Sequence, residues 1–365
     1  MGSPVVSYEH GEFQWALRLL YEKTGNASYY QYIKAGVDRV VGSDGSVGGG
    51  YNVSQYQLDP LRVGPSFIYL YSQTGEEKYK KAADVFHGQL ATHPRTAQGQ
   101  FWHKLIYPNQ GMCENCLRWL DGIYMGEVFY ATYTAAFQPN NQTAWNDILL
   151  QFTLMYNNTL QTLASTDSNS TYTGLLYHGY DYSHVQNWAS PDRGHSPEIW
   201  DRALGWYMMA LVDVIPLFPL SHPARQTLAA ILDTLVARLV AAAQRDAPAA
   251  GVWWLVMSKP GFARNYFESS GGAMFVYAVL RAIRTGLVED ADGGKIMAMK
   301  KAYEYMTENW VLPQRNGTMN WNNTVVVGSL QPGNDYDYYV SQAIDINDLK
   351  GAAAFVLASL EYELL

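Results

Sequence analysis

One stretch of the sequence, Gly174 to Val214, gathers the residue types that bind a sugar. It carries histidines, tyrosines and aspartates, followed by Trp200, Arg202 and Trp206 near the start of a predicted helix. Aromatic faces stack on the C–H surface of a sugar ring, and a guanidinium binds a carboxylate through two parallel hydrogen bonds. We therefore expect a site for a flat, anionic ring, with Arg202 binding its carboxylate.

The predicted helix begins with a typical capping sequence. Ser196 is a favourable N-cap, Pro197 fits the first helical position, and Glu198 suits the positive end of the helix dipole. The alternative role for Arg202 is a structural ion pair, with Asp201 or Glu198 as its partner.

Two aspartates are candidates for acid–base chemistry. Asp121 lies among aromatic residues, and an aromatic cleft would tune the pKa of its carboxyl for a role as general acid/base. A structural role as the N-cap of helix 122–137 explains Asp121 equally well. Asp59 precedes Pro60, a favourable capping pair, and capping is compatible with an assisting role in catalysis.

His103 and His178 are the histidine candidates, because both neighbour aromatic residues in long predicted loops. A lone histidine is nevertheless more often a packing residue. No HExxH pair, no glycine-rich phosphate loop after a strand and no GxSxG turn occurs in the chain. We therefore expect no metal and no organic cofactor.

The hydrophobic periodicity that positions these residues is helical almost throughout. Only 252–257 and 324–328 resemble strands. Apolar residues recur at three- and four-residue spacing in eleven segments: 8–23, 27–41, 60–73, 76–91, 117–137, 142–162, 197–217, 223–244, 268–285, 293–310 and 346–363.

An internal repeat shows how these helices are paired. Segment 19–36 aligns with segment 69–84, and Thr24-Gly25 and Thr74-Gly75 are fifty residues apart. Each copy predicts an apolar helix, a glycine C-cap and a more polar second helix. Six or seven such hairpins predict an open solenoid or a closed ring.

Polar and aromatic residues gather at the N-termini of every second helix, the more hydrophobic member of each pair. In a ring of hairpins these ends share one rim, together with the long loops. The positive ends of the helix dipoles then favour an anion. The residues at these starts are Tyr8 to His10, Asp59-Pro60, Trp119 to Asp121, Trp200 to Trp206, Glu268 to Ser270 and Asp345 to Lys350.

Composition limits the remaining choices. The net charge of −8 argues against nucleic acid. No apolar run reaches the roughly 20 residues of a membrane span. Cys113 and Cys116, the only cysteines, favour a small disulfide in an oxidising compartment. We expect one domain over 1–365 and secretion, with N-glycans on some of seven sequons: Asn26, Asn52, Asn141, Asn157, Asn169, Asn316 and Asn323.

Seven motifs follow one another along the chain: YEHG at 8–11, FWHK at 101–104, WLDGIYM at 119–125, YHGYD at 177–181, SPEIWDRALGWY at 196–207, ESSGGAMFVYA at 268–278 and NDLKGAAAF at 347–355. Their order resembles that of glycoside hydrolase family 105, the unsaturated rhamnogalacturonyl hydrolases, over essentially the whole chain. Family 88, the unsaturated glucuronyl hydrolases, shares the fold and is the nearest alternative.

The resemblance implies an all-α (α/α)6 barrel with its active site at the N-terminal ends of the inner helices. It implies that Asp121 is the general acid/base and that Asp59 assists it. The implied substrate is a lyase product, a pectic oligosaccharide ending in a 4,5-unsaturated uronic acid. The substrate-contacting positions are Tyr8, His103, His178, Trp200, Arg202 and Trp206.

Other functions remain open at this point. Another polyuronide is a possible substrate, as are saturated sugars hydrolysed by an inverting glycosidase with two separated carboxylates. A carbohydrate-binding protein without catalytic activity is a further alternative.

The sequence departs from the family pattern in two places. The GMCENCLR segment resembles an insertion before Asp121. The family also has a helix before YEHG, which this chain begins too late to supply. We therefore expect a gap in the outer ring beside helix 346–363, leaving Phe355, Leu357 and Leu360 partly uncovered and prone to association.

Overall fold

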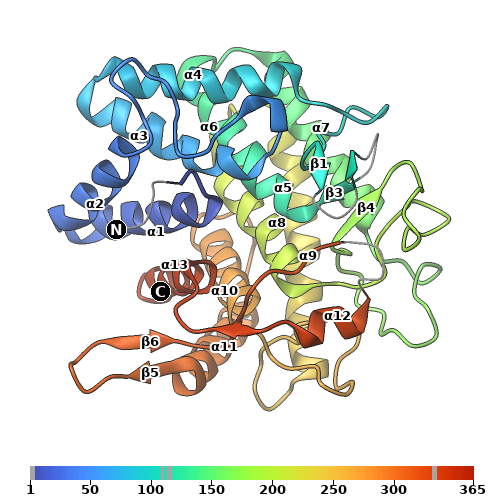
Figure 1. The fold of residues 1–365 in the computed structure, drawn as a ribbon. Helices are drawn as coiled ribbons and strands as arrows, with labels where there is room; N and C mark the ends of the chain where they lie inside the picture. The colour runs from blue at the N-terminus through green and yellow to red at the C-terminus, as the bar shows by residue number, and fades with distance from the viewer. Residues whose placement is uncertain (1–4, 108–110, 113–116, 331–334) are drawn as a thin grey trace.

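The computed structural model describes residues 5–107, 111–112, 117–330 and 335–365 (Figure 1). Cys113 and Cys116 lie outside these residues. The long helices are α1 (Tyr8–Thr24), α2 (Ala27–Asp38), α3 (Gly64–Thr74), α4 (Glu77–Thr92), α6 (Val128–Phe137), α7 (Gln142–Thr159), α8 (Asp201–Val214), α9 (Ala224–Asp246), α10 (Ser269–Arg284), α11 (Gly294–Trp310) and α13 (Leu349–Tyr362).

Short elements lie between the long helices. The strands form four separate two-stranded antiparallel sheets, β1–β2, β3–β4, β5–β6 and β7–β8. Their bounds are β1 (Ile106–Tyr107), β2 (Gly111–Met112), β3 (Leu117–Trp119), β4 (Gly179–Asp181), β5 (Val311–Pro313), β6 (Met319–Trp321), β7 (Thr324–Val325) and β8 (Ile344–Asp345). The short helices are η1 (Val53–Gln55), η2 (Asp59–Val63), α5 (Leu120–Gly122), the π-helix η3 (Ile123–Glu127), η4 (Ile215–Leu217) and α12 (Tyr336–Ser341).

Six helices close an inner ring in the order α1, α3, α6, α8, α10 and α13, and α13 packs back against α1. The helices α2, α4, α7, α9 and α11 pack outside them. Every residue of α8 is buried, as expected for an inner helix. The predicted helical barrel is confirmed. The predicted repeat is confirmed as well, because Gly25 and Gly75 end α1 and α3 in the left-handed conformation, with φ of 68° and 69°.

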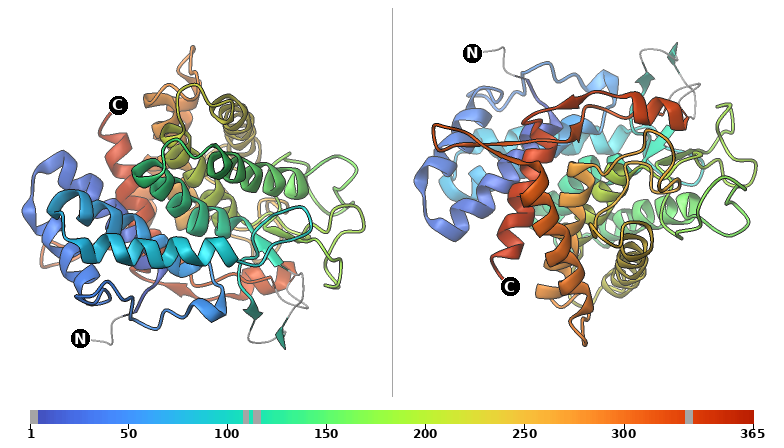
Figure 2. Two further views of the ribbon diagram at one scale, coloured as in Figure 1. Left: turned by 90° about the horizontal axis from the view of Figure 1, so that it is seen from above. Right: turned by 90° about the horizontal axis from the view of Figure 1, so that it is seen from below.

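The rim expected from the sequence is also present. Figure 2 shows the loop 42–58, strands β1 and β2, and helix α12 along one edge of the molecule. At the starts of the inner helices, η2 contacts η3 and β7 contacts α10.

Two inner helices begin later than predicted, because extended pairing takes their first residues. The backbone of Trp200 pairs with Val256, and Ser196 accepts a hydrogen bond from the Gly179 N–H instead of capping a helix. Helix α8 therefore starts at Asp201, and Trp200 is its N-cap. Likewise, residues 117–119 of predicted helix 117–137 form β3 and pair with β4.

An apolar groove of about 530 Å³ lies where a sixth outer helix would pack, between α1, α13 and the β5–β6 hairpin. Figure 1 shows this hairpin extending from the body beside α13. Phe355 lines the groove and is partly uncovered as expected. Leu357 and Leu360 are buried, 0% and 6% exposed, because α13 packs closely against α1 and α10.

Helix α9 corrects one expectation. By length and composition alone it is apolar enough to span a membrane, although half of its most apolar window is buried in the protein. It packs against α7, α8 and α11, as an outer helix of the barrel.

Six of the seven sequon asparagines are exposed: Asn26, Asn52, Asn141, Asn157, Asn169 and Asn316. The seventh, Asn323, is half-buried, and its side-chain amide donates to the carbonyl of Phe267. This hydrogen bond makes Asn323 a poor glycan acceptor.

Candidate active site

The two candidate carboxylates lie at the starts of two neighbouring inner segments. Asp59 is in the first turn of η2, and Asp121 is in the first turn of α5. Neither side chain caps its helix, because Leu58 and Trp119 hold the N-cap positions without side-chain hydrogen bonds. The capping explanation considered for both aspartates is therefore wrong, and the carboxylates are available for other contacts.

Asp59 is paired with a buried histidine. Its Oδ1 lies 3.1 Å from Nε2 of His103, whose side chain is 2% exposed. Burial acts to raise the pKa of the Asp59 carboxyl, but the charge of His103 and its hydrogen bond, helped by Lys104, hold the pKa below its usual value. Asp59 is therefore ionised at neutral pH.

Asp121 faces a second buried histidine without bonding to it. Its Oδ2 is 3.4 Å from Nε2 of His178, and within the described chain neither atom has a hydrogen-bond partner. Nδ1 of His178 lies 2.7 Å from the hydroxyl of Tyr339. The tyrosine holds the ring from behind, so that Nε2 points at Asp121.

The rings of this site contact one another in a continuous row. Trp119 stacks on His103 with 4.6 Å between centroids and lies 5.7 Å from the His178 ring. His178 in turn lies 4.9 Å from Trp200. These contacts fix the two histidines behind the two carboxylates.

Tyr8 closes the site from helix α1. It contacts the edge of Trp206, 6.2 Å between ring centroids, and Trp206 stacks on Tyr124. Burial raises the pKa of Tyr8 well above its usual value, and the charges of Glu9, Asp59 and Asp121 raise it further, while that of Arg202 lowers it. The hydroxyl of Tyr8 is therefore neutral and can donate a hydrogen bond.

Arg202 differs from its expected role. Its Nε donates to Ser270 Oγ at 2.6 Å, Nη1 to the carbonyl of Val326, and Nη2 to Glu268 and the carbonyl of Val325. At most one of the five guanidinium N–H groups remains. The bidentate grip on a substrate carboxylate is therefore not available in this structure, and the ion-pair partner is Glu268, not Asp201 or Glu198.

The two tryptophans are also more enclosed than expected. Trp200 and Trp206 are 2% and 1% exposed. A Cβ at Gly328 would lie 2.9 Å from the Trp200 ring, so the backbone of this loop covers that ring. The residues open to a ligand are Asp59, Asp121 and Tyr8, while the aromatic rings form the wall behind them.

Two residues near this wall, Tyr339 and Glu198, were not predicted from the sequence. Tyr339 comes from α12, inside a loop treated as a simple connection, and the cluster of tyrosines at 336–339 was the available signal. Glu198 was treated only as a helix-start residue or ion-pair partner. It is 4% exposed, and burial raises its pKa to about 7 despite a 2.5 Å hydrogen bond from Ser258 Oγ. Among the described residues, no group of three or more His, Cys, Asp or Glu is arranged to hold a metal ion.

Comparison with known proteins identifies the family of this chain. The sequence model of Glycosyl Hydrolase Family 88 matches residues 3–365. A family 105 glycoside hydrolase structure from C. acetobutylicum ATCC 824 is 35% identical, with a TM-score of 0.89, and the alignment covers 100% of this chain and 95% of that one.

Two further proteins extend the comparison. Protein Atu3128 of Agrobacterium fabrum (strain C58 / ATCC 33970) is 35% identical over 200 residues, 53% of this chain and 83% of that protein. An unsaturated glucuronyl hydrolase structure from Bacillus sp. GL1 is 14% identical with a TM-score of 0.62, covering 99% of this chain and 87% of that one, which shows a shared fold. The chain therefore belongs to Glycosyl Hydrolase Family 88 and, as its motifs predicted, to the glycoside hydrolases of family 105 within this helical-barrel group.

Proposed function

We propose that this glycoside hydrolase removes a 4,5-unsaturated uronic acid from the non-reducing end of oligosaccharides left by a polysaccharide lyase. One observation carries the proposal: the Asp121 side chain is partly exposed at the start of α5, and its buried Oδ2 lies 3.4 Å from a histidine held by Tyr339 without a hydrogen-bond partner among the described residues. A carboxylate free of protein partners suits proton transfer to and from a substrate.

The proposed reaction begins with protonation of C4 by Asp121, because the C4=C5 bond is an enol ether. Water adds at C5, and the Asp121 carboxylate accepts its proton, which regenerates the acid. The resulting hemiketal opens to a C5 ketone, its ring oxygen remains on C1, and C1 then expels the remaining sugar as an alcohol. One carboxyl group performs both proton transfers, so a second carboxylic acid is not required as in ordinary glycosidases.

The neighbouring groups have supporting roles in this proposal. Ionised Asp59, paired with His103, orients the water or a sugar hydroxyl as an acceptor. The neutral hydroxyl of Tyr8 donates a hydrogen bond to the sugar, and the charge of Arg202 attracts the uronate carboxylate with at most one N–H.

The sugar next to the uronate is proposed to be rhamnose, as in rhamnogalacturonan fragments. This finer assignment follows from the motif resemblance to family 105 and from the similar hydrolase of that family. The name of the more distant Bacillus protein, a hydrolase described as responsible for glycosaminoglycan degradation, keeps another polyuronide as the second candidate.

A panel of lyase-generated oligosaccharides tests the proposal. We expect the ultraviolet absorbance of the double bond to disappear fastest with rhamnogalacturonan fragments, while saturated counterparts remain intact. Hydrolysis of saturated sugars would indicate an inverting glycosidase, and tight product binding without turnover would indicate a binding protein.

Secretion and N-glycosylation are further parts of the proposal. The six exposed sequon asparagines support them, since a glycan on any of these residues would project into solvent. Expression in a eukaryotic secretory host followed by glycosidase treatment and mass measurement would detect occupied sites, and none is expected at Asn323.

A further inference from the structure

The two candidate carboxylates lie on two short helical segments that contact each other. Asp59 is the first residue of the 3₁₀-helix η2. Asp121 lies in α5, which continues directly into the π-helix η3. Within the inner ring, η2 contacts η3. The contacts between these two segments therefore set the distance between the two carboxylates.

One buried hydrogen bond joins the two segments. Nη2 of Arg62, in η2, donates to the hydroxyl of Tyr124, in η3, over 2.7 Å. The guanidinium also lies over the Tyr124 ring, with 4.3 Å between its central carbon and the ring centroid. Both side chains are buried, 1% and 0% exposed. Because a planar guanidinium must meet both the hydroxyl and the ring face, the pair restricts the rotation of η2 against η3 as well as their distance.

Each member of this pair lies three residues after one of the aspartates. Arg62 follows Asp59 by three positions, and Tyr124 follows Asp121 by three positions. Side chains at this spacing eclipse one another in a 3₁₀-helix and are neighbours on one face of other helices. The Arg62–Tyr124 hydrogen bond therefore lies about one turn further into the barrel than the two carboxylates.

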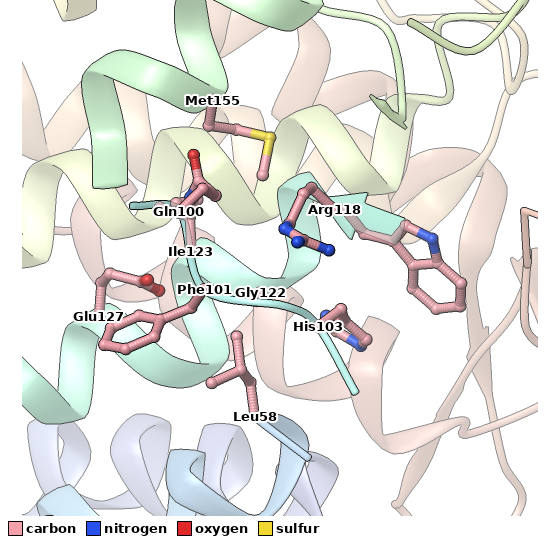
Figure 3. Close-up of a pocket in the computed structure, with 10 residues that line it drawn as sticks. Leu58, Gln100, Phe101, His103, Arg118, Gly122, Ile123, Glu127 and Met155 are labelled. Atoms are coloured by element: carbon pink, nitrogen blue, oxygen red, sulfur yellow. The ribbon is translucent and has the colours of Figure 1, made fainter. Parts of the chain in front are cut away.

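Two glycines let η2 approach closely from the same side. A Cβ at Gly122 would lie 3.2 Å from Cδ1 of Leu58, the residue before Asp59, and a Cβ at Gly126 would lie 3.0 Å from Cδ2 of Leu58. Figure 3 shows Leu58 and His103 near Gly122. One apolar contact and one hydrogen bond thus hold the two segments together.

A buried arginine is an expensive way to join two segments. Nε of Arg62 has no hydrogen-bond partner among the residues that the structure describes. Replacing both members of a buried polar pair by well-packed apolar side chains often leaves a protein equally stable or more stable. Adhesion alone therefore does not explain the Arg62–Tyr124 pair, whereas the fixed geometry of its hydrogen bond does.

We propose that Arg62 and Tyr124 are a positioning pair, which holds Asp59 and Asp121 at the separation that hydrolysis requires. The pair acts only through the segments that carry the two aspartates. The structural part of this inference is independent of the proposed hydrolase function, while its kinetic part rests on that function.

The structural test needs no substrate. In the double variant Arg62→Met/Tyr124→Phe, apolar groups of similar size replace both polar groups, so the free energy of unfolding should stay close to that of wild type. Crystal structures of the wild type and the variant should differ in the separation of the Asp59 and Asp121 carboxylates by about 0.5 Å or more, the tolerance of a catalytic site. An unchanged separation would overturn the proposal, whether or not the enzyme hydrolyses unsaturated uronates.

The kinetic test uses the same double variant. We expect kcat to fall about tenfold while KM changes less than about threefold, because the reacting groups move but the sugar contacts remain. Arg62→Lys keeps a cation and a donor without the planar fork, so it should recover part of this loss. Tyr207→Phe is the matched control and should leave kcat and the carboxylate separation unchanged. Its buried hydroxyl donates to the carbonyl of Phe152 in α7 over 2.9 Å, and not between η2 and η3.

Each remaining outcome decides the matter. A tenfold loss of kcat with unmoved carboxylates would overturn the proposal, because the loss would then have another route. Moved carboxylates with unchanged kcat would also overturn it, because their separation would not limit hydrolysis. If the wild type does not hydrolyse unsaturated uronates, the proposed function is wrong, and the crystal structures still decide whether the pair holds the carboxylates. If the double variant does not fold, Tyr124→Phe, which loses only the hydroxyl, replaces it in both measurements.

Discussion

The site contains two carboxylate–histidine pairs that differ in how the two groups meet. In the first pair, Asp59 and His103 are 3.1 Å apart, and the pairing lowers the pKa of the aspartate. In the second, Asp121 and His178 are 3.4 Å apart without a hydrogen bond between them. The histidines are held differently too: the hydroxyl of Tyr339 lies at Nδ1 of His178, whereas Nδ1 of His103 has no hydrogen-bond partner among the described residues.

The difference in hydrogen bonding suits the two aspartates to different roles, one electrostatic and one in proton transfer. A carboxylate that is ionised and bound by its histidine suits charge and orientation, because moving its proton would break an existing hydrogen bond. A carboxylate with a free oxygen can protonate a substrate and accept a proton back without that loss. The geometry thus agrees with Asp121 as the acid/base and Asp59 as its assistant.

The largest effect is expected for Asp121→Asn, which tests this division directly. The fold should be unaffected, because Oδ2 has no protein hydrogen bond to lose within the described chain. Turnover should fall about 10²–10⁴-fold, since the amide cannot transfer a proton. The loss of double-bond absorbance gives kcat, and Asp233→Asn on the exposed face of α9 is the control. Activity above a tenth of wild type would remove Asp121 from the acid/base role.

Asp59→Asn should have a smaller effect, of about 10–100-fold on kcat/KM. The variant loses the charge that holds His103, while Asp121 remains able to transfer protons. Because the pKa of Asp59 lies below its usual value, wild type should keep this charge as the pH falls below the ordinary aspartate range and lose it only at the lower pKa. The variant should lack that acid limb in its pH–rate profile. A loss as large as that of Asp121→Asn would contradict the difference between the pairs.

The sequence predicted the barrel because its inner and outer helices differ in periodic hydrophobicity, which local residues determine. It also predicted which residues meet at the rim, since helix starts in a ring share one end. It did not predict the helix start at Asp201, because the pairing of Trp200 with Val256 depends on a loop about fifty residues away.

The same limit applies to side-chain partners. The residue types around Arg202 suggested an anion site. In the structure its guanidinium instead donates to four protein acceptors: the side chains of Ser270 and Glu268 and the backbone carbonyls of Val325 and Val326. Nothing in the spacing of the sequence places Val325 or Val326 beside Arg202. Tyr339 was missed for the same reason, as 161 residues separate it from His178.

Glu198→Gln sharpens the comparison, because Glu198 acts on only one of the two pairs. Its backbone carbonyl accepts from the His178 N–H, and its charge raises the pKa of Tyr339 in addition to the effect of burial. The pKa of Glu198 is raised to about 7, so the unfolded chain ionises it more readily than the folded protein. The stability from this group is fully present below about pH 4.5 and is lost as the pH rises through 7.

The variant removes this dependence. At pH 8 we expect Glu198→Gln to be more stable than wild type by about 2 kcal/mol, and near pH 4.5 the two should be similar. Chemical denaturation from pH 4.5 to 8 measures the difference. Exposed Glu304→Gln on α11 is the control. Parallel pH profiles for Glu198→Gln and wild type would show that Glu198 is ionised throughout this range.

The smallest effect is expected for Tyr339→Phe, which makes the His178 pair resemble the His103 pair by removing the protein hydroxyl at Nδ1. One neutral hydrogen bond contributes about 1 kcal/mol, so kcat should fall about fivefold as the histidine loses its fixed orientation. Because the phenyl ring retains its contacts with Trp200, the free energy of unfolding should change little beyond this bond. Tyr338→Phe is the matched control, since its hydroxyl bonds to Ser329 and Val327 and not to a histidine. The deciding measurement is the ratio of the kcat values of Tyr339→Phe and Tyr338→Phe. Equal losses of kcat in the two variants would mean that the loop containing α12, and not the Tyr339 hydroxyl, supports His178.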